Sequence, residues 1–410
     1  RDLGQHIRDQ VKITFVKGDA TTTLNREVCD RYYMSLKRLA SNQYGQTYAC
    51  SRTNGASGLT REQCHLALSP ELLEYYNLED KGFFVLMVNE VLEYLEPLSG
   101  KTFVDMTFGA GGHSIKILQT SPNVKIFALD RDPVAHEFAH KLSEKYPGQV
   151  IPLLGRFSEL PQLLCQHKVE KNSIDGFLFD FGCSSMQFDV AQRGFSLSKN
   201  GPLDMRMDGF RCPEEPTVAD VLERVTEIDL IHILRVYGEE KKAKKIARAI
   251  VETRYNFRSL KTTEELATLI ESVVNEKRLD RLGRFAHCAT KTFQALRIFV
   301  NNELNEINYG IIVAASYLKT NGRLVTISFH SLEDTVVKRH ISGNIQHFVA
   351  NRVPLKYADC SKQFSADEID SIMKSPWKML HKHVITPTPE EIEENPRSRS
   401  AKLRAISKVM

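Results

Sequence analysis

The sequence lacks several features that would place it in a special class of protein. No apolar run approaches the roughly 20 residues that a membrane-spanning helix requires, which argues against an integral membrane protein. The eight cysteines show neither a C-x-x-C spacing nor a pairing pattern, so we expect no disulfide framework and no structural metal. The formal net charge is only +4 on 410 residues. The placement of charge therefore says more than its total about a nucleic-acid partner.

Acidic residues are missing from one stretch near the N-terminus. Between Arg31 and Arg61 there is no Asp or Glu, while Arg, Lys, Ser, Asn and Gln are frequent. Segments of this composition are typical of organellar transit peptides, and a basic disordered tail would look the same. We expect residues 1–70 to be a basic, transit-like or disordered N-terminal region. The transit-like alternative predicts a location in the mitochondrial matrix.

What the sequence does contain is a strand pattern that runs into a glycine-rich turn and then an amphipathic helix. The stretch reads Phe103-Val-Asp-Met-Thr-Phe-Gly-Ala-Gly-Gly-His-Ser114. Glycine lets the backbone take positive φ or approach a ligand closely, and a helix N-terminus offers free N–H groups. A second strand pattern ends at Asp130, where an acid is placed to take the two hydroxyls of a ribose. Together they predict a nucleotide-type cradle.

The identity of the cofactor follows from what this turn lacks. The dinucleotide pattern G-x-G-x-x-G would need a third glycine where this chain has Ser114. Asp105, just before the turn, would oppose a pyrophosphate but suits a cofactor with a ribose and a cationic end. The pattern therefore favours S-adenosylmethionine over NAD. An NAD oxidoreductase stays as an alternative that cofactor binding to the purified chain would decide.

The order of strand and helix patterns predicts the fold. Strands and helices alternate up to Asp180, which implies a parallel sheet with right-handed crossovers. A long helical pattern follows, and a strand returns at Gly322–Ser328. We expect an α/β fold, a doubly wound Rossmann-like sheet with an inserted all-α domain between strands four and five. The expected parts are residues 81–190 and 306–410 for the sheet domain and 205–305 for the insert, with a C-terminal hairpin made of strand His383–Thr386, a turn at Pro389–Glu394 and strand Ala401–Ile406.

Several longer motifs accompany this pattern. They are Asp105-x-Thr-x-Gly-x-Gly-Gly-His113, Asp130-Arg-Asp-Pro133, Arg193-Gly-Phe-Ser196, Gly201-Pro-Leu-Asp-Met-Arg-Met-Asp208, Tyr237-Gly-Glu-Glu240, Thr292-Phe-Gln-Ala-Leu-Arg297 and Ser328-Phe-His-Ser-Leu-Glu-Asp334. The set resembles the ribosomal RNA (cytidine-N4) methyltransferases of the MraW/RsmH family. This resemblance implies that the Rossmann-like sheet is that of a class I S-adenosylmethionine methyltransferase. With the transit-like N-terminus, the set is most similar to the mitochondrial branch of that family. The chain departs from the family at Phe83, where a His is usual, and at Val85, where a Pro is usual.

The resemblance implies an activity and a set of site residues. The chain would methylate N4 of a cytidine in small-subunit ribosomal RNA, mitochondrial 12S RNA in this branch, and so support assembly of the mitochondrial ribosomal subunit. A cofactor-binding ribosome-assembly factor without turnover is the alternative, which a methyl-transfer assay would separate. By analogy with the family, the S-adenosylmethionine contacts fall on Gly111, Gly112, His113, Asp130, Phe157, Asp180 and Gln187.

The chemistry of the reaction points to Asp180. The exocyclic amine of cytosine donates its lone pair into the ring, so an enzyme must position it and accept a hydrogen bond from it. We expect a carboxylate or carbonyl at Asp180-Phe-Gly-Cys183 to do this. DNA amino-methyltransferases carry an acid or Asn followed by Pro-Pro and an aromatic residue here, and this chain has no such motif.

A basic segment in the helical insert is the candidate RNA contact. Phosphate contacts from Lys and Arg supply much of the affinity for RNA, although a solvated helix face would have the same composition. The basic residues are Lys241, Lys242, Lys244, Lys245 and Arg248. The histidines His113, His287 and His330 lack the spacing of metal ligands, so we expect hydrogen-bonding roles for them and no metal.

Overall fold

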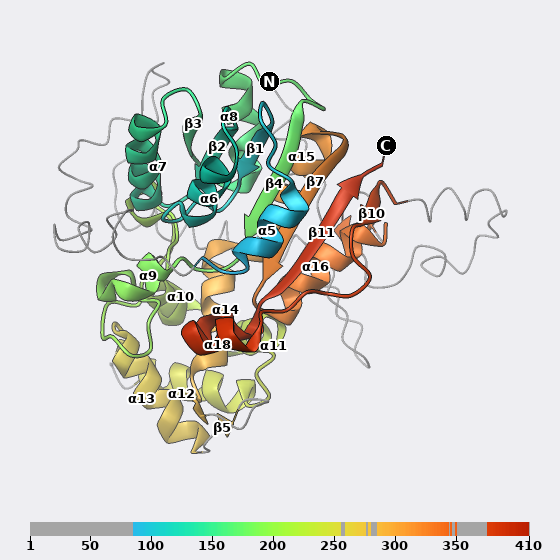
Figure 1. The fold of residues 1–410 in the computed structure, drawn as a ribbon. Coiled ribbons are helices and arrows are strands. Elements are labelled where there is room, and N and C mark those ends of the chain that lie inside the picture. The colour runs from blue at the N-terminus through green and yellow to red at the C-terminus, as the bar shows by residue number, and fades with distance from the viewer. Residues whose placement is uncertain are drawn as a thin grey trace. The chain divides into compact units, whose positions relative to one another are not determined.

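The computed structural model describes residues 85–255, 259–275, 278–279, 285–343, 345–346, 349–350 and 375–409. The expected N-terminal region 1–70 and Phe83 lie outside the described residues. The described chain forms two compact units, one of residues 85–182 and 304–409 and one of residues 183–303 (Figure 1). Every helix within these ranges is too short or too polar to cross a membrane.

The first unit is built on a seven-stranded sheet with the order β10-β11-β7-β4-β1-β2-β3. Strands β1, β2, β3, β4 and β7 run parallel, whereas β11 is antiparallel to β7 and β10 is antiparallel to β11. The chain moves outward from β1 through β2 to β3 and then returns to place β4 on the other side of β1. The carboxyl ends of β1 and β4 therefore flank a topological switch point, the usual ligand crevice of such sheets. The strands are β1 (Thr102–Asp105), β2 (Lys125–Asp130), β3 (Val150–Leu154), β4 (Ile174–Asp180), β7 (Leu318–Ser328), β10 (Trp377–Met379) and β11 (Lys402–Lys408).

The central strands form because their apolar runs are buried on both faces. In β2 four successive residues, Ile126 to Leu129, are each at most 1% exposed, and in β4 the same holds from Phe177 to Phe179. Continuous burial of this kind is characteristic of a parallel sheet covered by helices. Helix α5 lies in front of β4 and β7 in Figure 1, while α16 lies behind β7 and β11. The α-helices of this unit are α5 (Val88–Leu95), α6 (Gly112–Thr120), α7 (Pro133–Lys145), α8 (Leu160–Gln166), α15 (Glu303–Tyr317), α16 (Ser331–Ile341) and α18 (Pro389–Glu394), and its short elements are the 3₁₀ turns η1 (Phe157–Glu159) and η5 (Pro396–Ser400) with the two-residue pair β8 (Ile345–Gln346) and β9 (Val349–Ala350).

The C-terminal edge of the sheet differs from the expected hairpin. Strand β11 pairs with β10, and the segment that was expected to be its partner makes only one isolated bridge, from Ile385 to Leu403. The prediction was wrong because Pro387 and Pro389 follow directly and have no N–H to extend a ladder. The predicted turn is instead helix α18, which starts with Thr388 as N-cap and Pro389 in its first turn.

The second unit is helical. Its helices are α9 (Ser185–Asp189), α10 (Val218–Arg224), α11 (Glu227–Gly238), α12 (Ala243–Tyr255), α13 (Thr263–Val274) and α14 (Thr290–Asn301), with 3₁₀ turns η2 (Ala191–Arg193) and η3 (Gly209–Arg211). It follows β4 and precedes β7, so the predicted insertion point between the fourth and fifth strands of the sheet is confirmed. The description all-α was wrong in one detail, because β5 (Arg278–Leu279) and β6 (Phe285–Ala286) form a small antiparallel pair.

The helical unit begins at Cys183, ahead of the expected residue 205. The reason is that the polar loop before α10 carries apolar side chains into the helical core, among them Phe195, Leu203 and Met205. Asn301 of α14 fixes this loop, since its side-chain carbonyl accepts the N–H of Met207 at 2.7 Å and its amide donates to the carbonyl of Met205 at 2.7 Å. The loop is therefore part of the fold of this unit.

Candidate cofactor and methyl-transfer site

The turn after β1 has the backbone that its glycines predict. Gly109 and Gly111 take φ values of 54° and 83°, in the left-handed region, and Gly111 is the N-cap of α6. A Cβ on Gly111 would stand 2.6 Å from the ring of Phe108, and one on Gly112 would stand 2.5 Å from the side chain of Val85. Side chains at these positions would push the turn apart. The turn is closed by the N–H of Gly111, which donates to the carbonyl of Phe108 at 2.8 Å.

Asp130 ends β2 and is tied to this turn. Its Oδ2 accepts the N–H of Gly109 at 2.8 Å and its Oδ1 accepts the N–H of Asp132 at 2.9 Å. Burial, with the nearby charge of Asp132 as a second cause, raises the pKa of Asp130 to about 7, and the two backbone hydrogen bonds act in the opposite direction. Each carboxylate oxygen keeps a further lone pair for an additional donor. Asp130 thus offers free acceptor capacity at the carboxyl end of β2, and its contact with a ribose remains a prediction.

Three titratable side chains gather where β1 and β4 end. Asp105 is 2% exposed and accepts hydrogen bonds from the hydroxyl of Ser114 at 2.7 Å and the N–H of Thr107 at 3.2 Å. Burial raises the pKa of Asp105, although Ser114 and the neighbouring His113 oppose this shift. The Nε2 of His113 lies 3.7 Å from Oδ2 of Asp180.

His113 and Asp180 keep hydrogen-bonding capacity that the described residues do not use. Both ring nitrogens of His113 and the Oδ1 of Asp180 are shielded from solvent, and no described residue forms a hydrogen bond with any of the three atoms. The main chain of Asp180 is fixed, since its N–H donates to the hydroxyl of Thr107 at 2.7 Å. Unsatisfied polar atoms of this kind are uncommon in folded proteins and call for an explanation such as a ligand. They fit a ligand with polar groups at the switch point.

Phe157 follows β3 in η1 and is partly exposed. Its ring meets that of Phe179 edge to face, with centroids 5.4 Å apart and an interplanar angle of 90°. The turn is held by Glu306 of α15, a residue that the sequence analysis did not select. The carboxylate of Glu306 accepts the N–H of Ser158 at 3.0 Å and its hydroxyl at 2.9 Å. No local sequence signal identifies this clamp, because 148 residues separate its partners.

The remaining predicted residues lie in the helical unit. Gln187 closes the capping box of α9, where its side chain accepts the N–H of Ser184 at 3.2 Å. In α12, Ile246 and Ile250 are buried in the core while Lys244, Lys245 and Arg248 are exposed. Lys241 is exposed and Lys242 partly exposed just before the helix. The RNA-binding role of these side chains and the cofactor contact of Gln187 remain predictions.

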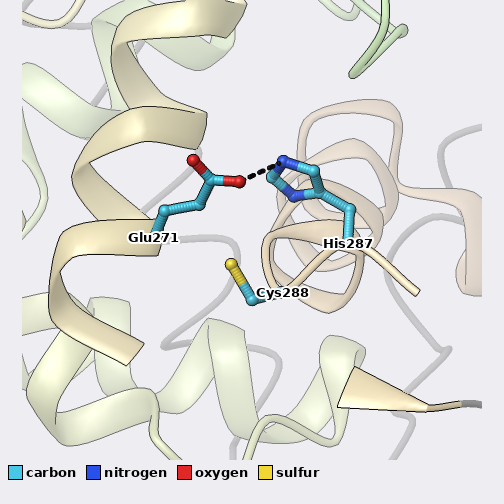
Figure 2. A group of neighbouring side chains, drawn as sticks. All are labelled: Glu271, His287 and Cys288. Carbon is cyan, nitrogen blue, oxygen red and sulfur yellow. Dashed lines mark ion pairs between the residues drawn. The ribbon is translucent and has the colours of Figure 1, made fainter. Parts of the chain in front are cut away.

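One cluster in the helical unit has the residue types of a metal site. Figure 2 shows Glu271, His287 and Cys288, whose ligand-type atoms lie within 4.8 Å of one another. The Nδ1 of His287 accepts the N–H of Ala289 at 3.1 Å, so in the neutral ring the proton is on Nε2, which lies 3.0 Å from Oε1 of Glu271. A metal ion bound at Nε2 would have to displace that proton. Because Nδ1 carries no proton either, the ring would then have none on either nitrogen. The geometry therefore favours a hydrogen-bonded pair of His287 and Glu271.

His330 likewise takes a hydrogen-bonding role. It is the N-cap of α16 and forms a capping box with Glu333, whose Oε1 lies 3.0 Å from its Nε2. The box stands at the carboxyl end of β7, the strand next to β4. For His113 the expected role stays a prediction, since its ring has no hydrogen bond to the described residues.

Comparison with known protein families gives two matches along the chain. The model of the MraW methylase family matches residues 82–409. A second family model, described as complex III assembly factor UQCC2/CBP6, matches residues 1–62, which lie outside the described residues.

Similar proteins carry related names. The chain is 48% identical to the Mus musculus protein named 12S rRNA N(4)-cytidine methyltransferase METTL15, over 79% of this chain and 82% of that protein. It is 39% identical to ribosomal RNA small subunit methyltransferase H of Ehrlichia canis, over 79% of this chain and 99% of that protein. A Culex quinquefasciatus protein named as a receptor-type tyrosine-protein phosphatase, mosPTP-1, is 52% identical over 100% of this chain. This chain spans only 29% of that protein's length, so its name is not carried over.

Proposed function

The chain belongs to the MraW methylase family, and we propose from that membership that it transfers a methyl group from S-adenosylmethionine to N4 of a cytidine in small-subunit ribosomal RNA. The observation that carries the proposal is the family match over residues 82–409, which takes in the whole sheet unit and its helical insert. Relatives named for 12S RNA and for the bacterial small subunit support the choice of substrate.

The residues at the switch point fit the cofactor. S-adenosylmethionine, when bound, supplies an electrophilic methyl group on a positively charged sulfur. Asp130 accepts hydrogen bonds from the ribose hydroxyls, and the N–H of Gly112 at the start of α6 faces polar atoms of the ligand. Gly111 lets the ligand approach the turn closely, while its own N–H donates to the carbonyl of Phe108. The buried ring nitrogens of His113, which have no hydrogen-bond partner among the described residues, provide a further polar contact. Phe157 presents the exposed part of its ring to the adenine.

Asp180 is the residue that acts on the substrate. Its Oδ1 accepts a hydrogen bond from the N4 amine of the cytosine and so turns the nitrogen lone pair out of the ring. The carboxylate also stabilises positive charge as it grows on that nitrogen, an effect that belongs mainly to the transition state. The backbone hydrogen bond to Thr107 holds Asp180 in place, which limits the reorganisation needed during the reaction.

The helical unit contributes the contact with RNA. The exposed lysines at the start of α12 bind phosphates of the small-subunit RNA, and the target nucleotide must be unstacked or single-stranded to be reached. The relatives named for 12S RNA support a mitochondrial ribosomal RNA as substrate and hence a mitochondrial location. Within the mitochondrion we place the protein in the matrix, on a subunit under assembly.

A methyl-transfer assay tests the proposal. Purified full-length chain is incubated with labelled S-adenosylmethionine and a transcript of the small-subunit RNA, and nucleosides from the digested RNA are separated by mass spectrometry. The expected product is N4-methylcytidine, with a transcript of large-subunit RNA as the control substrate. Cofactor binding without any methylated cytidine on naked RNA or on isolated small subunits would favour the assembly factor without turnover.

A further inference from the structure

The aromatic residue that follows Asp180 in the chain is not available to a substrate base. Phe181 is 3% exposed, and its ring packs beside that of Phe179 with centroids 5.4 Å apart. Its N–H donates to the carbonyl of Ile327 at 3.0 Å, which continues the pairing of β4 with β7. Successive side chains of a strand point to opposite faces, so Phe181 turns away from the face that Asp180 occupies.

The neighbouring strand supplies a different ring at the same end of the sheet. Asp180 pairs with Ile327, so the chain beyond Ser328 continues past the level of Asp180 at the carboxyl edge. Phe329 is the first residue after β7 and is partly exposed. It borders Gly182, whose φ is 102°. A Cβ added to Gly182 would lie 3.7 Å from the Phe329 ring, and no other described atom would be nearer. The Phe329 ring therefore lies next to the Gly182 backbone, two residues beyond Asp180.

A buried carboxylate holds the Phe329 turn in place. Glu333 is 0% exposed, and its Oε2 accepts the N–H of Phe329 at 2.7 Å and that of His330 at 3.3 Å. Its Oε1 lies 3.0 Å from Nε2 of His330. Two backbone N–H groups of one short turn therefore bond to a single carboxylate oxygen, so the backbone that carries Phe329 is fixed before any substrate arrives.

We propose that Phe329 is the surface on which the target cytosine stacks, with Glu333 as the positioning residue that fixes it. The inference deepens the proposed function, on which it rests. An amino group can be methylated only when its base has left the RNA stack, and the lost stacking must be replaced by an aromatic or apolar side chain. Phe329 borders Gly182, two residues beyond Asp180 at the same end of the sheet, so it can hold the ring while Asp180 accepts the hydrogen bond from N4.

A pair of substitutions at Phe329 tests this role. Phe329→Leu removes the aromatic face and is expected to raise KM for the small-subunit transcript roughly 10- to 100-fold, the scale of losing one stacked base. Phe329→Tyr keeps the face and should stay close to the parent. The affinity for S-adenosylmethionine, measured by calorimetry, should not change in either variant. Phe157→Leu is the matched control and should show the reverse, weaker cofactor binding with an unchanged KM for RNA.

A second measurement does not depend on turnover. Trp377 is the only tryptophan in the chain, so Trp377→Phe combined with Phe329→Trp leaves one indole at the proposed stacking position. The transcript, added with S-adenosylhomocysteine, should quench the emission of that indole. RNA binding by filter retention without quenching would overturn the inference, as would a Phe329→Leu variant with the KM and kcat of the parent. Quenching in the double variant, together with a parent that never methylates the transcript, would contradict the proposed function and leave the stacking surface standing.

Discussion

The Asp130 carboxylate shows how the fold prepares a residue for a ligand. It is partly buried, it holds two backbone N–H groups in place, and its pKa is about 7. The folded state therefore retains the proton at a higher pH than the unfolded chain, in which the pKa is near 3.8. The contribution of this group to the free energy of unfolding is fully present below the unfolded pKa and falls as the pH rises towards about 7. The proposed contact with the ribose has the opposite preference, because hydroxyls donate more strongly to the ionised carboxylate.

The first prediction concerns the pH dependence of cofactor affinity. The affinity for S-adenosylmethionine should rise by up to about tenfold between one pH unit below and one unit above the pKa of Asp130, because the ionised fraction rises in that window. Calorimetry across this range measures it. Asp130→Ala should bind roughly 10–100-fold more weakly at the upper end, and its affinity should lose this rise with pH. If the affinity of the parent does not change with pH and Asp130→Ala binds S-adenosylmethionine as tightly as the parent, Asp130 does not contact the ribose.

The second prediction concerns Asp180 and the chemical step. Asp180→Asn keeps the shape of the side chain without its charge, so the single-turnover methylation rate should fall roughly 100- to 1000-fold at saturating cofactor. Asp175→Asn is the matched control, since Asp175 lies near the opposite end of the same strand and pairs with Lys319 at 2.9 Å. A rate within threefold of the parent for Asp180→Asn would place the acceptor in the backbone of residues 181–185 instead.

At the scale of elements, α16 shows how a helix start can support a site. Glu333 closes the capping box with His330 and fixes the turn that carries Phe329. The third prediction is that Glu333→Gln lowers the free energy of unfolding by about 1–3 kcal/mol, because a neutral amide would replace the charged acceptor of two backbone N–H groups in a buried position. Urea unfolding measures the loss. Glu390→Gln on the exposed start of α18 is the control for the same chemical change, and equal stability of the two variants would contradict the described hydrogen bonds.

Helix α12 has a buried apolar stripe and an exposed basic face, so its lysines can be replaced without changing the core. The fourth prediction is that Lys244→Ser with Lys245→Ser weakens RNA binding and reduces the dependence of log affinity on log salt by up to about two units. Lys168→Ser with Lys171→Ser removes the same charge from exposed positions between α8 and β4 and should leave the slope unchanged. Cofactor affinity should stay constant in both. An unchanged salt dependence in the α12 variant would mean that this basic face contacts solvent and not RNA.

The strands could be predicted well where burial alone decides the structure. The ranges of β2, β3 and β4 follow from apolar runs bounded by polar or turn residues. The C-terminal strand pairing could not be predicted this way, because two prolines and a helix cap outweighed the β-branched residues of the segment 383–386. Strand pairing at the edge of a sheet requires backbone N–H donors, and the periodicity of side chains does not show where such donors are missing.

At the scale of the whole molecule, the cradle could be predicted because its parts are local. Gly111, His113 and Asp130 belong to a turn and to the next strand, and the topology of a parallel sheet brings them to one edge. The supports of the site were missed for the opposite reason. Glu306 bonds to Ser158 across 148 residues, and the Asn301 clamp bonds to Met205 across 96. Contacts between distant segments leave no periodic signal in a single sequence.

The central claim about the whole molecule is that this chain methylates a cytidine of the mitochondrial small-subunit RNA at N4. The fifth and most direct measurement maps N4-methylcytidine in that RNA from cells that have the gene, from cells that lack it, and from cells that carry the Asp180→Asn form. One methylated cytidine should be present in the first, absent in the second and strongly reduced in the third. An unchanged methylation pattern in cells without the protein would contradict the account.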